Sequence, residues 1–275
     1  MKISRHIVHL LLACSVGLIG STTRLASAAE EPFRPTVGQE GKDVVWVPTP
    51  PVLVEKMLDL ARVTPQDYVM DLGSGDGRNI IAAAKRVARG LGVEFNPKMV
   101  ELATRTAQSE GVADKASFVQ GDMYQADISR ATVLALFLLP DNLRKLTPKF
   151  LDLKPGTRIV ANHFGIDGWE ADVTERIDGE CMAWCTALLY IVPAKVAGTW
   201  RLADGELELA QKFQAISGTL RRAGAELPIE NGKLEGNEIR FKVSGTEYSG
   251  RVEGDAMSGK LSGESGAWKA SRVAK

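Results

Sequence analysis

Three glycines at alternate positions follow a carboxylate in one short segment, Asp71-Leu72-Gly73-Ser74-Gly75-Asp76-Gly77. An apolar run precedes Asp71, so the segment is typical of a buried strand that ends in a turn and opens a helix. Glycine adopts positive φ without steric strain and lets a ligand lie against bare backbone. Three glycines in this context indicate a ligand-binding loop, whereas a single glycine would indicate only a tightly packed connection.

Polar or otherwise unusual residues also follow the next predicted strands. Apolar runs predict these strands over residues 91–95, 116–120, 132–138 and 157–161. Helical patterns alternate with them, over residues 52–63, 79–88 and 98–109 and from Pro140 onward. This alternation predicts a Rossmann-like α/β fold with a doubly wound parallel sheet, in which a ligand lies beyond the carboxyl ends of the strands. The residues at those ends are Asp71, Glu94, Asp122, the Leu139-Pro140 pair and His163.

Two families of nucleotide-binding protein share an acid and a glycine-rich loop in this order. A dinucleotide-binding fold requires Gly-x-Gly-x-x-Gly, but here the third glycine falls one place early, at Gly77, and Arg78 takes the expected position. That departure counts against an NAD-dependent oxidoreductase, which stays as an alternative. An NAD site would also leave the Gly121-Asp122 pair unexplained.

Residues 45–170 resemble the class I S-adenosylmethionine-dependent methyltransferases. The segment 71–77 matches their first motif, Glu94 their ribose-binding acid, and Asp122 the acid near the adenine amine. The most similar subgroup is that of the small protein-lysine methyltransferases related to the mitochondrial ATP synthase c-subunit enzyme, through Val47-Pro48-Thr49-Pro50, the segment 71–78 and Leu138-Leu139-Pro140. The resemblance implies S-adenosylmethionine as cofactor and a nitrogen acceptor such as a protein lysine. It does not extend to residues 196–275.

The resemblance gives each strand-end residue a role. The Glu94 carboxylate can accept both ribose hydroxyls, and Asp122 can pair with the adenine amine. Asp71, with the bare backbone of two loop glycines, would hold the methionine end, whose ammonium requires an acid and whose carboxylate requires amide hydrogens. Taken singly, Glu94 and Asp122 are equally well explained as helix-capping or solvated acids. The predicted cofactor-binding residues are Asp71, Gly73, Ser74, Gly75, Gly77, Glu94, Phe95, Asp122 and Met123.

Methyl transfer is an in-line displacement, so the protein has mainly to align donor and acceptor and to exclude water. A lysine acceptor must also lose a proton from an amine whose pKa is about 10.4. The candidates to assist are, in order, Asp76, Thr49, Asp141 and His163. His163 is alternatively a structural hydrogen-bonding residue, and Trp169 is either a wall of the acceptor site or core packing.

Charge and composition exclude several other classes. The 275-residue chain has 34 basic and 34 acidic residues spread along its length, so it has no electrostatic footprint for nucleic acid. Beyond residue 28 only one histidine remains, His163, which excludes a multi-histidine zinc site. We therefore predict no metal site, and a Ser-His-Asp mechanism would depend on that one histidine.

The N-terminus has the pattern of a signal for export. Basic residues precede an apolar run over residues 7–19, and Ala26-Ser27-Ala28 offers a cleavage site. We expect cleavage after Ala28, a periplasmic location and no membrane span thereafter; a lipoprotein anchor at Cys14 is the lesser alternative. Because S-adenosylmethionine is a cytosolic cofactor, an exported binding or interaction module with little or no turnover is an alternative function.

Cys181 and Cys185 form an even pair in a compartment that favours disulfides. The residues between and after them have the composition of a strand, in which cysteines four apart are too distant to bridge. A disulfide therefore requires a turn between the two cysteines.

The pattern changes near residue 193. Short alternating segments, frequent glycines and the Asn231-Gly232 hairpin signal predict a small antiparallel meander or barrel over residues 194–275, closed by its own end strands. It either packs on the first domain or holds a partner, and a lipocalin-like pocket is a further alternative. The predicted organisation is a signal peptide (1–28), an extended lead-in (29–44), a methyltransferase domain (45–193) and this β domain. The oligomeric state is not predicted.

Overall fold

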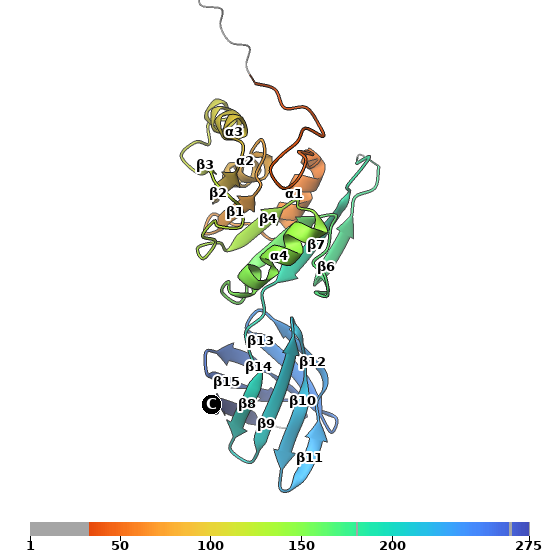
Figure 1. Ribbon diagram of the computed structural model, residues 1–275. Helices are drawn as coiled ribbons and strands as arrows, with labels where there is room; N and C mark the ends of the chain where they lie inside the picture. Colours follow the sequence, from red (N-terminus) through yellow and green to blue (C-terminus); the bar gives the residue numbers. More distant parts are fainter. Residues whose placement is uncertain (1–32, 180, 264–265, 275) are drawn as a thin grey trace, which may run out of the picture. The chain divides into compact units, whose positions relative to one another are not determined.

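The computed structural model describes residues 33–179, 181–263 and 266–274 (Figure 1). The predicted signal peptide, its cleavage site at Ala28 and Cys14 lie outside the described residues. Within the described ranges, none of the helices has both the length and the apolar character that a bilayer crossing demands.

The first sheet contains seven strands in the order β3-β2-β1-β4-β5-β7-β6. Neighbours among the first five strands are parallel, β7 pairs antiparallel with β5, and β6 pairs antiparallel with β7. The predicted α/β methyltransferase-type fold is confirmed, and the predicted strands up to residue 162 form its parallel part. The later strands β6 and β7 add an antiparallel hairpin at the edge of the sheet. The strands are β1 (Tyr68–Leu72), β2 (Arg89–Glu94), β3 (Ala116–Gln120), β4 (Val133–Leu136), β5 (Arg158–Asn162), β6 (Val173–Arg176) and β7 (Thr186–Ile191).

Helices cover both faces of this sheet, and alternate strand residues supply the two cores. On one face Leu72, Leu134 and Leu136 are buried with Phe150 of α4. On the other, Val69, Val133 and Val160 are buried with residues of α1, α2 and α3. This alternation produces the apolar runs that predicted the buried strands. The helices are α1 (Pro51–Leu60), α2 (Arg78–Lys85), α3 (Pro97–Ser109) and α4 (Pro140–Leu151).

Local capping explains where helix α3 begins. Pro97 is the first residue of α3, and the Asn96 side chain accepts a hydrogen bond from the Lys98 amide at 3.0 Å. Proline suits this position because its missing N–H would have had no helical partner. The cap directs the chain away from the end of β2, so that Glu94 is left at the carboxyl edge of the sheet.

The second sheet contains nine antiparallel strands in the order β11-β10-β12-β13-β14-β15-β16-β8-β9, and an additional β9–β10 pairing closes it into a barrel. Its first and last strands pair through Ala270 and Leu202, as predicted. Its interior is filled by buried aromatic side chains, including Trp200 and Phe241. The strands are β8 (Gly198–Leu202), β9 (Glu206–Lys212), β10 (Ala215–Arg222), β11 (Ala225–Pro228), β12 (Glu230–Glu235), β13 (Glu238–Val243), β14 (Thr246–Glu253), β15 (Ala256–Leu261) and β16 (Ala267–Arg272).

The hairpin predicted at Asn231-Gly232 is wrong. Both residues lie within β12, where the register shifts between Glu230 and Lys233. Asn231 has φ of +51°, which is the left-handed conformation that asparagine tolerates. The dipeptide therefore makes a bulge in a continuing strand instead of a turn between two strands.

A few contacts join the two sheets. Trp169, in the loop between β5 and β6, stacks on Phe213 with ring centroids 5.2 Å apart, and the Gln214 side chain donates a hydrogen bond to the Glu170 carbonyl at 2.7 Å. Trp169 is 3% exposed and also contacts Tyr190 edge-on. It belongs to the packing between the sheets, and the alternative that it walls an acceptor site is wrong.

Candidate functional site

A cavity of about 100 Å³ opens at the carboxyl edge of the first sheet. The glycine loop, the end of β2, the loop after β3 and the lead-in segment 39–49 form its walls. The predicted site residues that line it are Thr49, Asp71, Gly73, Ser74, Gly75, Asp76, Glu94, Phe95, Asp122 and Met123.

The three glycines of the loop all have positive φ, but they differ in their surroundings. Gly73 (φ +76°) is exposed and open toward the cavity. At Gly75 (φ +54°) a Cβ would lie 2.7 Å from Trp46 Nε1, and at Gly77 (φ +81°) it would lie 2.6 Å from the Phe118 ring. Gly77 does not line the cavity; it is the N-cap residue of helix α2 and allows close packing against Phe118.

The loop amides are already used within the protein. The Gly73 amide donates to the Val93 carbonyl at 2.8 Å, and the Gly75 amide donates to Glu94 Oε2 at 2.9 Å. In this arrangement neither amide offers a free hydrogen to a ligand carboxylate, and their expected role stays a prediction. Arg78 also lines the cavity and is the cation next to this loop. These hydrogen bonds fix the shape of the loop and keep Glu94 in place.

Asp71 is a buried carboxyl without a cationic partner. It is 3% exposed, and among the described side chains only the Asn79 amide donates to it, at 3.0 Å. Burial raises the pKa of Asp71 to about 8; the Asn79 hydrogen bond opposes this shift, and the charges of Glu94 and Asp76 add to it. A ligand ammonium at this position would favour the ionised carboxylate.

Glu94 is held by two backbone amides at the end of β2. Its Oε2 accepts from Gly75, and its Oε1 accepts from the Asn96 amide at 2.8 Å. Each carboxylate oxygen can accept more than one hydrogen bond, so capacity remains for two ligand hydroxyls. The geometry fits the predicted ribose role, and the Asp71 and Glu94 positions together fit S-adenosylmethionine.

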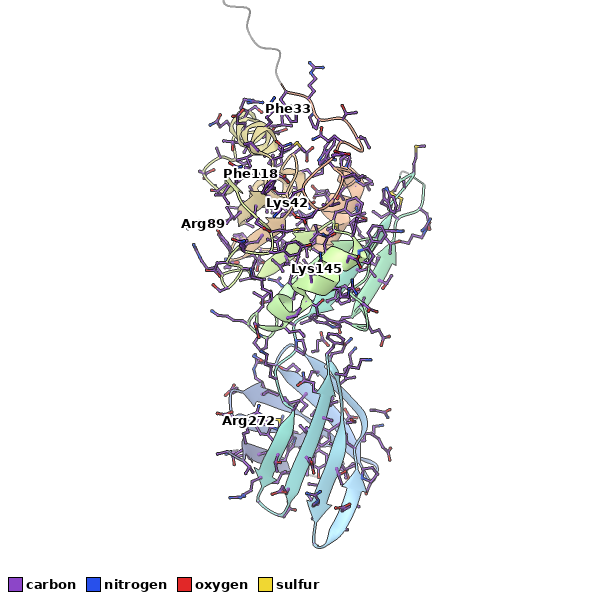
Figure 2. All side chains as sticks on the ribbon, viewed as in Figure 1. Phe33, Lys42, Arg89, Phe118, Lys145 and Arg272 are labelled. Atoms are coloured by element: carbon purple, nitrogen blue, oxygen red, sulfur yellow. A yellow bond between two sulfur atoms is a disulfide. The ribbon has the colours of Figure 1, made fainter. Side chains whose placement is uncertain are left out.

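A lysine of the lead-in segment lies at the predicted adenine end, where sequence reasoning missed it. Lys42 is labelled in Figure 2. Its Nζ is 2.6 Å from Asp122 Oδ2 and 4.9 Å from the centre of the Phe95 ring. Asp122 Oδ1 accepts from the Tyr124 amide at 2.8 Å. The hydrogen bond to Lys42 lowers the pKa of Asp122, so this carboxylate stays ionised at neutral pH. No local pattern signals a contact between residues 80 positions apart.

Two of the predicted catalytic candidates lie in the cavity wall with their polar groups engaged. Arg78 binds both oxygens of Asp76, through Nη2 at 2.5 Å and Nε at 2.9 Å, and donates to the Thr49 carbonyl at 2.7 Å. The Thr49 hydroxyl accepts from the Asn162 amide at 3.3 Å, and both residues are buried. The structure thus makes Asp76 part of an ion pair, which does not suit it to act as a free base.

The other two candidates do not line the cavity. Asp141 is exposed in the first turn of α4 and pairs with Arg144 at 2.8 Å. An acid at this position is stabilised by the helix dipole. The exposed His163 has φ of +64°, and its ring lies edge-on to Trp184 at 4.9 Å and to Phe164 at 5.1 Å. His163 therefore belongs to an aromatic cluster beside the cavity.

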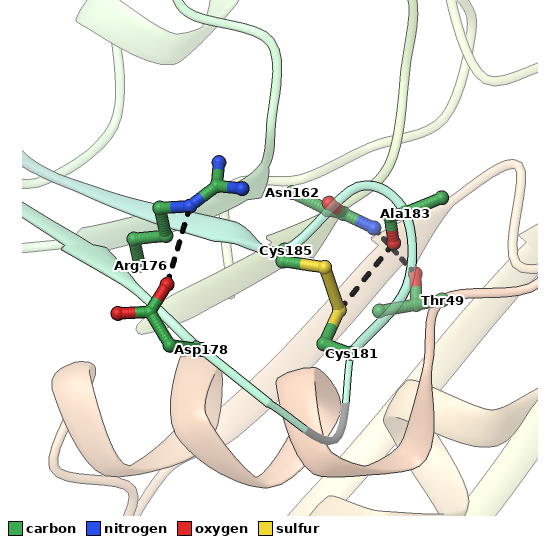
Figure 3. The surroundings of a disulfide bond; sticks show 7 residues. All are labelled: Thr49, Asn162, Arg176, Asp178, Cys181, Ala183 and Cys185. Atoms are coloured by element: carbon green, nitrogen blue, oxygen red, sulfur yellow. Dashed lines mark hydrogen bonds and ion pairs between the residues drawn. A yellow bond between two sulfur atoms is a disulfide. The ribbon is translucent and has the colours of Figure 1, made fainter.

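Cys181 and Cys185 form a disulfide with a Cα–Cα distance of 5.7 Å (Figure 3). The strand predicted after the cysteines is confirmed as β7, which begins at Thr186, but residues 182–184 are not part of it because the chain bends between the cysteines. That bend brings the two sulfurs within bonding reach. The Cys185 carbonyl accepts from the Ile177 amide at 2.8 Å, which anchors the loop to the end of β6.

Comparison with known proteins shows which family the chain resembles. The model of the ANTKMT methyltransferase domain matches residues 71–173. A protein-lysine N-methyltransferase of Saccharolobus islandicus is 41% identical over 152 residues, which are 54% of this chain and 94% of that protein. An ATP synthase c-subunit lysine N-methyltransferase of Xenopus laevis is 30% identical over 167 residues, covering 60% of this chain and 72% of the relative.

A solved structure extends the comparison to three dimensions. The crystal structure of an RNA methyltransferase from Salinibacter ruber, in complex with S-adenosyl-L-homocysteine, is 43% identical and superposes with a TM-score of 0.51. The match covers 55% of this chain and 96% of that one. All three relatives are thus methyltransferases, and one was solved with the demethylated cofactor bound.

Proposed function

The chain belongs to the ANTKMT family of methyltransferases, and from this premise we propose that it transfers the methyl group of S-adenosylmethionine to the side-chain amine of a protein lysine. The resemblance to class I methyltransferases is confirmed, and family membership sets aside the NAD-dependent alternative. The acceptor class is supported by the two lysine methyltransferases among the relatives. The observation that carries the proposal is the buried Asp71 carboxyl, which faces the cavity without a cation.

S-adenosylmethionine supplies an activated methyl group on a positively charged sulfur. The residues of this chain would bind and orient it: Asp71 takes the ammonium, Glu94 takes the ribose hydroxyls, and Asp122 with Phe95 takes the adenine. On the acceptor side, the Thr49 hydroxyl is fixed by Asn162 and can orient an incoming amine. The amine loses its proton to solvent before transfer, because Asp76 is held by Arg78.

Calorimetric titration with S-adenosyl-L-homocysteine tests the cofactor assignment. We expect wild-type protein to bind, and we expect Asp71→Ala and Glu94→Ala to weaken binding by about 10- to 100-fold, the effect of losing a hydrogen bond to a charged group. Glu101→Ala is the matched control, because Glu101 is a solvent-exposed acid on the adjacent helix α3. Unchanged binding in both site variants would reject the assignment.

Transfer of a labelled methyl group tests the acceptor. We expect label on poly-L-lysine and on lysine-containing proteins, and none after their lysines have been acetylated. Transfer to RNA with none to protein would contradict the proposal and would match the activity for which the Salinibacter ruber relative is named.

We also propose that the chain is exported and works in an oxidising compartment such as the periplasm. The N-terminal pattern supports this, and so does the Cys181–Cys185 disulfide, because disulfides persist mainly in oxidising compartments. Cell fractionation with mass analysis of the N-terminus tests it, and activity confined to uncleaved cytosolic protein would refute export. Cofactor binding by the exported protein without methyl transfer to any acceptor would favour the binding-module alternative.

A further inference from the structure

Side chains from three separate segments meet in an aromatic cluster, which we define as Phe137, His163, Phe164 and Trp184. The Trp184 ring lies 6.1 Å from that of Phe137, 5.4 Å from that of Phe164 and 4.9 Å from that of His163. The Phe137 and Phe164 rings stack at 6.3 Å. These residues follow β4 and β5 and precede β7, so the cluster is at the same edge of the sheet as the cofactor cavity.

The cluster runs from the cavity to the surface. Phe137 lines the cavity, whereas Trp184 is 39% exposed and His163 is also exposed. An aromatic side chain is normally held in place by burial of its apolar area. Burial alone does not explain why the partly exposed Trp184 lies beside the cavity.

Two members of the cluster have strained backbone conformations that surrounding contacts maintain. Trp184 has φ of +58° and His163 has φ of +64°, conformations that are unfavourable for bulky residues. Such strain persists only where surrounding contacts maintain it, and it is found preferentially at functional sites. Here the contacts include the disulfide next to Trp184 and the hydrogen bond from the His163 amide to the Thr186 carbonyl at 2.7 Å.

We propose that the aromatic cluster binds the alkyl-ammonium side chain of the acceptor lysine and guides it to the methyl group, a role that rests on the proposed function. Aromatic faces attract ammonium groups, and flat rings pack well against a chain of methylene groups. Continuity with the cavity through Phe137 places such a side chain beside the cofactor. Methylation retains the positive charge, so the cluster also accommodates lysines that are already partly methylated.

Binding of a small cationic probe tests this role directly. The probe is Nα-acetyl-Nε-trimethyl-lysine amide, titrated by calorimetry into both free and S-adenosyl-L-homocysteine-saturated protein, with the uncharged Nα-acetyl-norleucine amide as comparator. We expect the cation to bind at least about fivefold more tightly than the neutral compound. We expect Trp184→Ala to remove that preference and Trp184→Phe to retain most of it.

Two controls separate this effect from damage to the loop. Met182→Ala changes a fully exposed residue of the same loop and should leave probe binding unchanged. S-adenosyl-L-homocysteine affinity should stay within about twofold of wild type in the Trp184 variants. In methyl-transfer assays with poly-L-lysine, Trp184→Ala should raise KM for the acceptor about fivefold or more, with a smaller change in kcat.

The disulfide positions Trp184 and is tested separately. A dithiol reductant converts the S–S bond into two thiols and is itself oxidised to a cyclic disulfide. We expect reduction, or the Cys181→Ser variant, to weaken binding of the cationic probe about threefold while S-adenosyl-L-homocysteine binding persists. Reoxidation of the wild-type protein should restore probe affinity.

Failure of this inference is distinguishable from failure of the proposed function. If cofactor binding and lysine methylation are intact but Trp184→Ala binds the cationic probe as well as wild type does, the aromatic cluster has no acceptor role. If wild-type protein does not bind S-adenosyl-L-homocysteine, the proposed function fails. The titration into free protein still shows whether the cluster recognises an alkyl-ammonium group.

Discussion

The carboxyl edge of the first sheet and the closed second sheet use polar residues in opposite ways. At the edge, Asp71 is buried without a cation, and the neighbouring Glu94 and Asp76 charges make its ionisation still less favourable. In the second sheet, charged side chains lie outside and pair across strands, as Arg251 does with Glu238 at 2.8 Å. Its interior is filled by aromatic and aliphatic side chains.

This difference indicates where the chemistry takes place. Uncompensated buried charge is unfavourable in an isolated protein, and a cationic ligand can offset it. The first sheet has such a group beside a cavity, whereas no Asp or Glu of the second sheet is buried among the described residues, and several of its charges form exposed ion pairs. We therefore expect the chemistry at the first sheet and not at the second, and the following experiments test that division from the largest expected effect to the smallest.

Two glycines with nearly equal φ provide the strongest test. Gly77→Ala should lower the free energy of unfolding by about 2–4 kcal/mol, because it combines a positive φ of +81° with a clash against Phe118. Gly245→Ala in the second sheet has φ of +82° and open space around the new methyl group, so about 1 kcal/mol is expected. Chemical denaturation measures both, and equal losses would show that packing around the glycine loop is not tight.

Phe213→Ala tests the contact between the two sheets. Loss of the stack on Trp169 should lower the free energy of unfolding by about 2 kcal/mol. Cofactor affinity should stay within about twofold of wild type, because Phe213 does not line the cavity. Lys212→Ala, at the neighbouring exposed position, is the control. A large loss of cofactor affinity in Phe213→Ala would show that the second sheet takes part in the chemistry.

The raised pKa of Asp71 predicts a pH dependence of cofactor binding. The folded protein keeps this proton up to about pH 8, whereas the unfolded chain loses it near pH 4, so this group lowers the stability of the free protein as pH rises from 4 to 8. A ligand ammonium requires the ionised form, so affinity should rise about fivefold from pH 7 to pH 8 as a proton is released.

Calorimetry in buffers of different ionisation enthalpy measures the number of protons released when the ligand binds. Asp71→Asn should bind more weakly and should lose the proton release that belongs to Asp71, while any pH dependence of the ligand's own amine remains. Identical proton release by wild type and Asp71→Asn would mean that Asp71 does not contact the ammonium.

The smallest effect is expected on the surface of the second sheet. Arg251→Ala removes an exposed cross-strand ion pair, in which both side chains are more than half exposed. We expect a loss of about 0.5 kcal/mol in low salt, and none in 1 M salt, because exposed pairs are weak and screened. A loss of free energy of unfolding above 2 kcal/mol would show that this surface ion pair contributes substantially to stability.

The parts of the site that sequence could predict are those set by local structure. Asp71, Glu94 and Asp122 each follow a predicted strand, and parallel strands bring their carboxyl ends to one edge. The cap of α3 at Asn96 follows from the same short-range rules. Chain-local patterns were therefore sufficient to bring these three acids to the cavity, but they did not predict that the lead-in segment 39–46 lines it.

The other parts depend on contacts between distant segments. Lys42 meets Asp122 across 80 positions, and Trp184 contacts Phe137 of the cavity wall from a loop that a disulfide closes. The candidates Asp141 and His163 do not line the cavity, because a position after a strand does not fix where a side chain points. The bulge at Asn231 likewise depends on pairing with strands on both sides, which a hairpin signal does not contain.

The Lys42 contact has a consequence for ligand discrimination. Since Asp122 already has a cationic partner, an arriving adenine amine exchanges one hydrogen bond for another and adds little net free energy. The adenine end of the site then discriminates poorly among ligands that contain adenosine. Selection falls to the amino-acid end, where Asp71 has no partner to give up, so free adenosine should compete weakly with a ligand that also carries an ammonium.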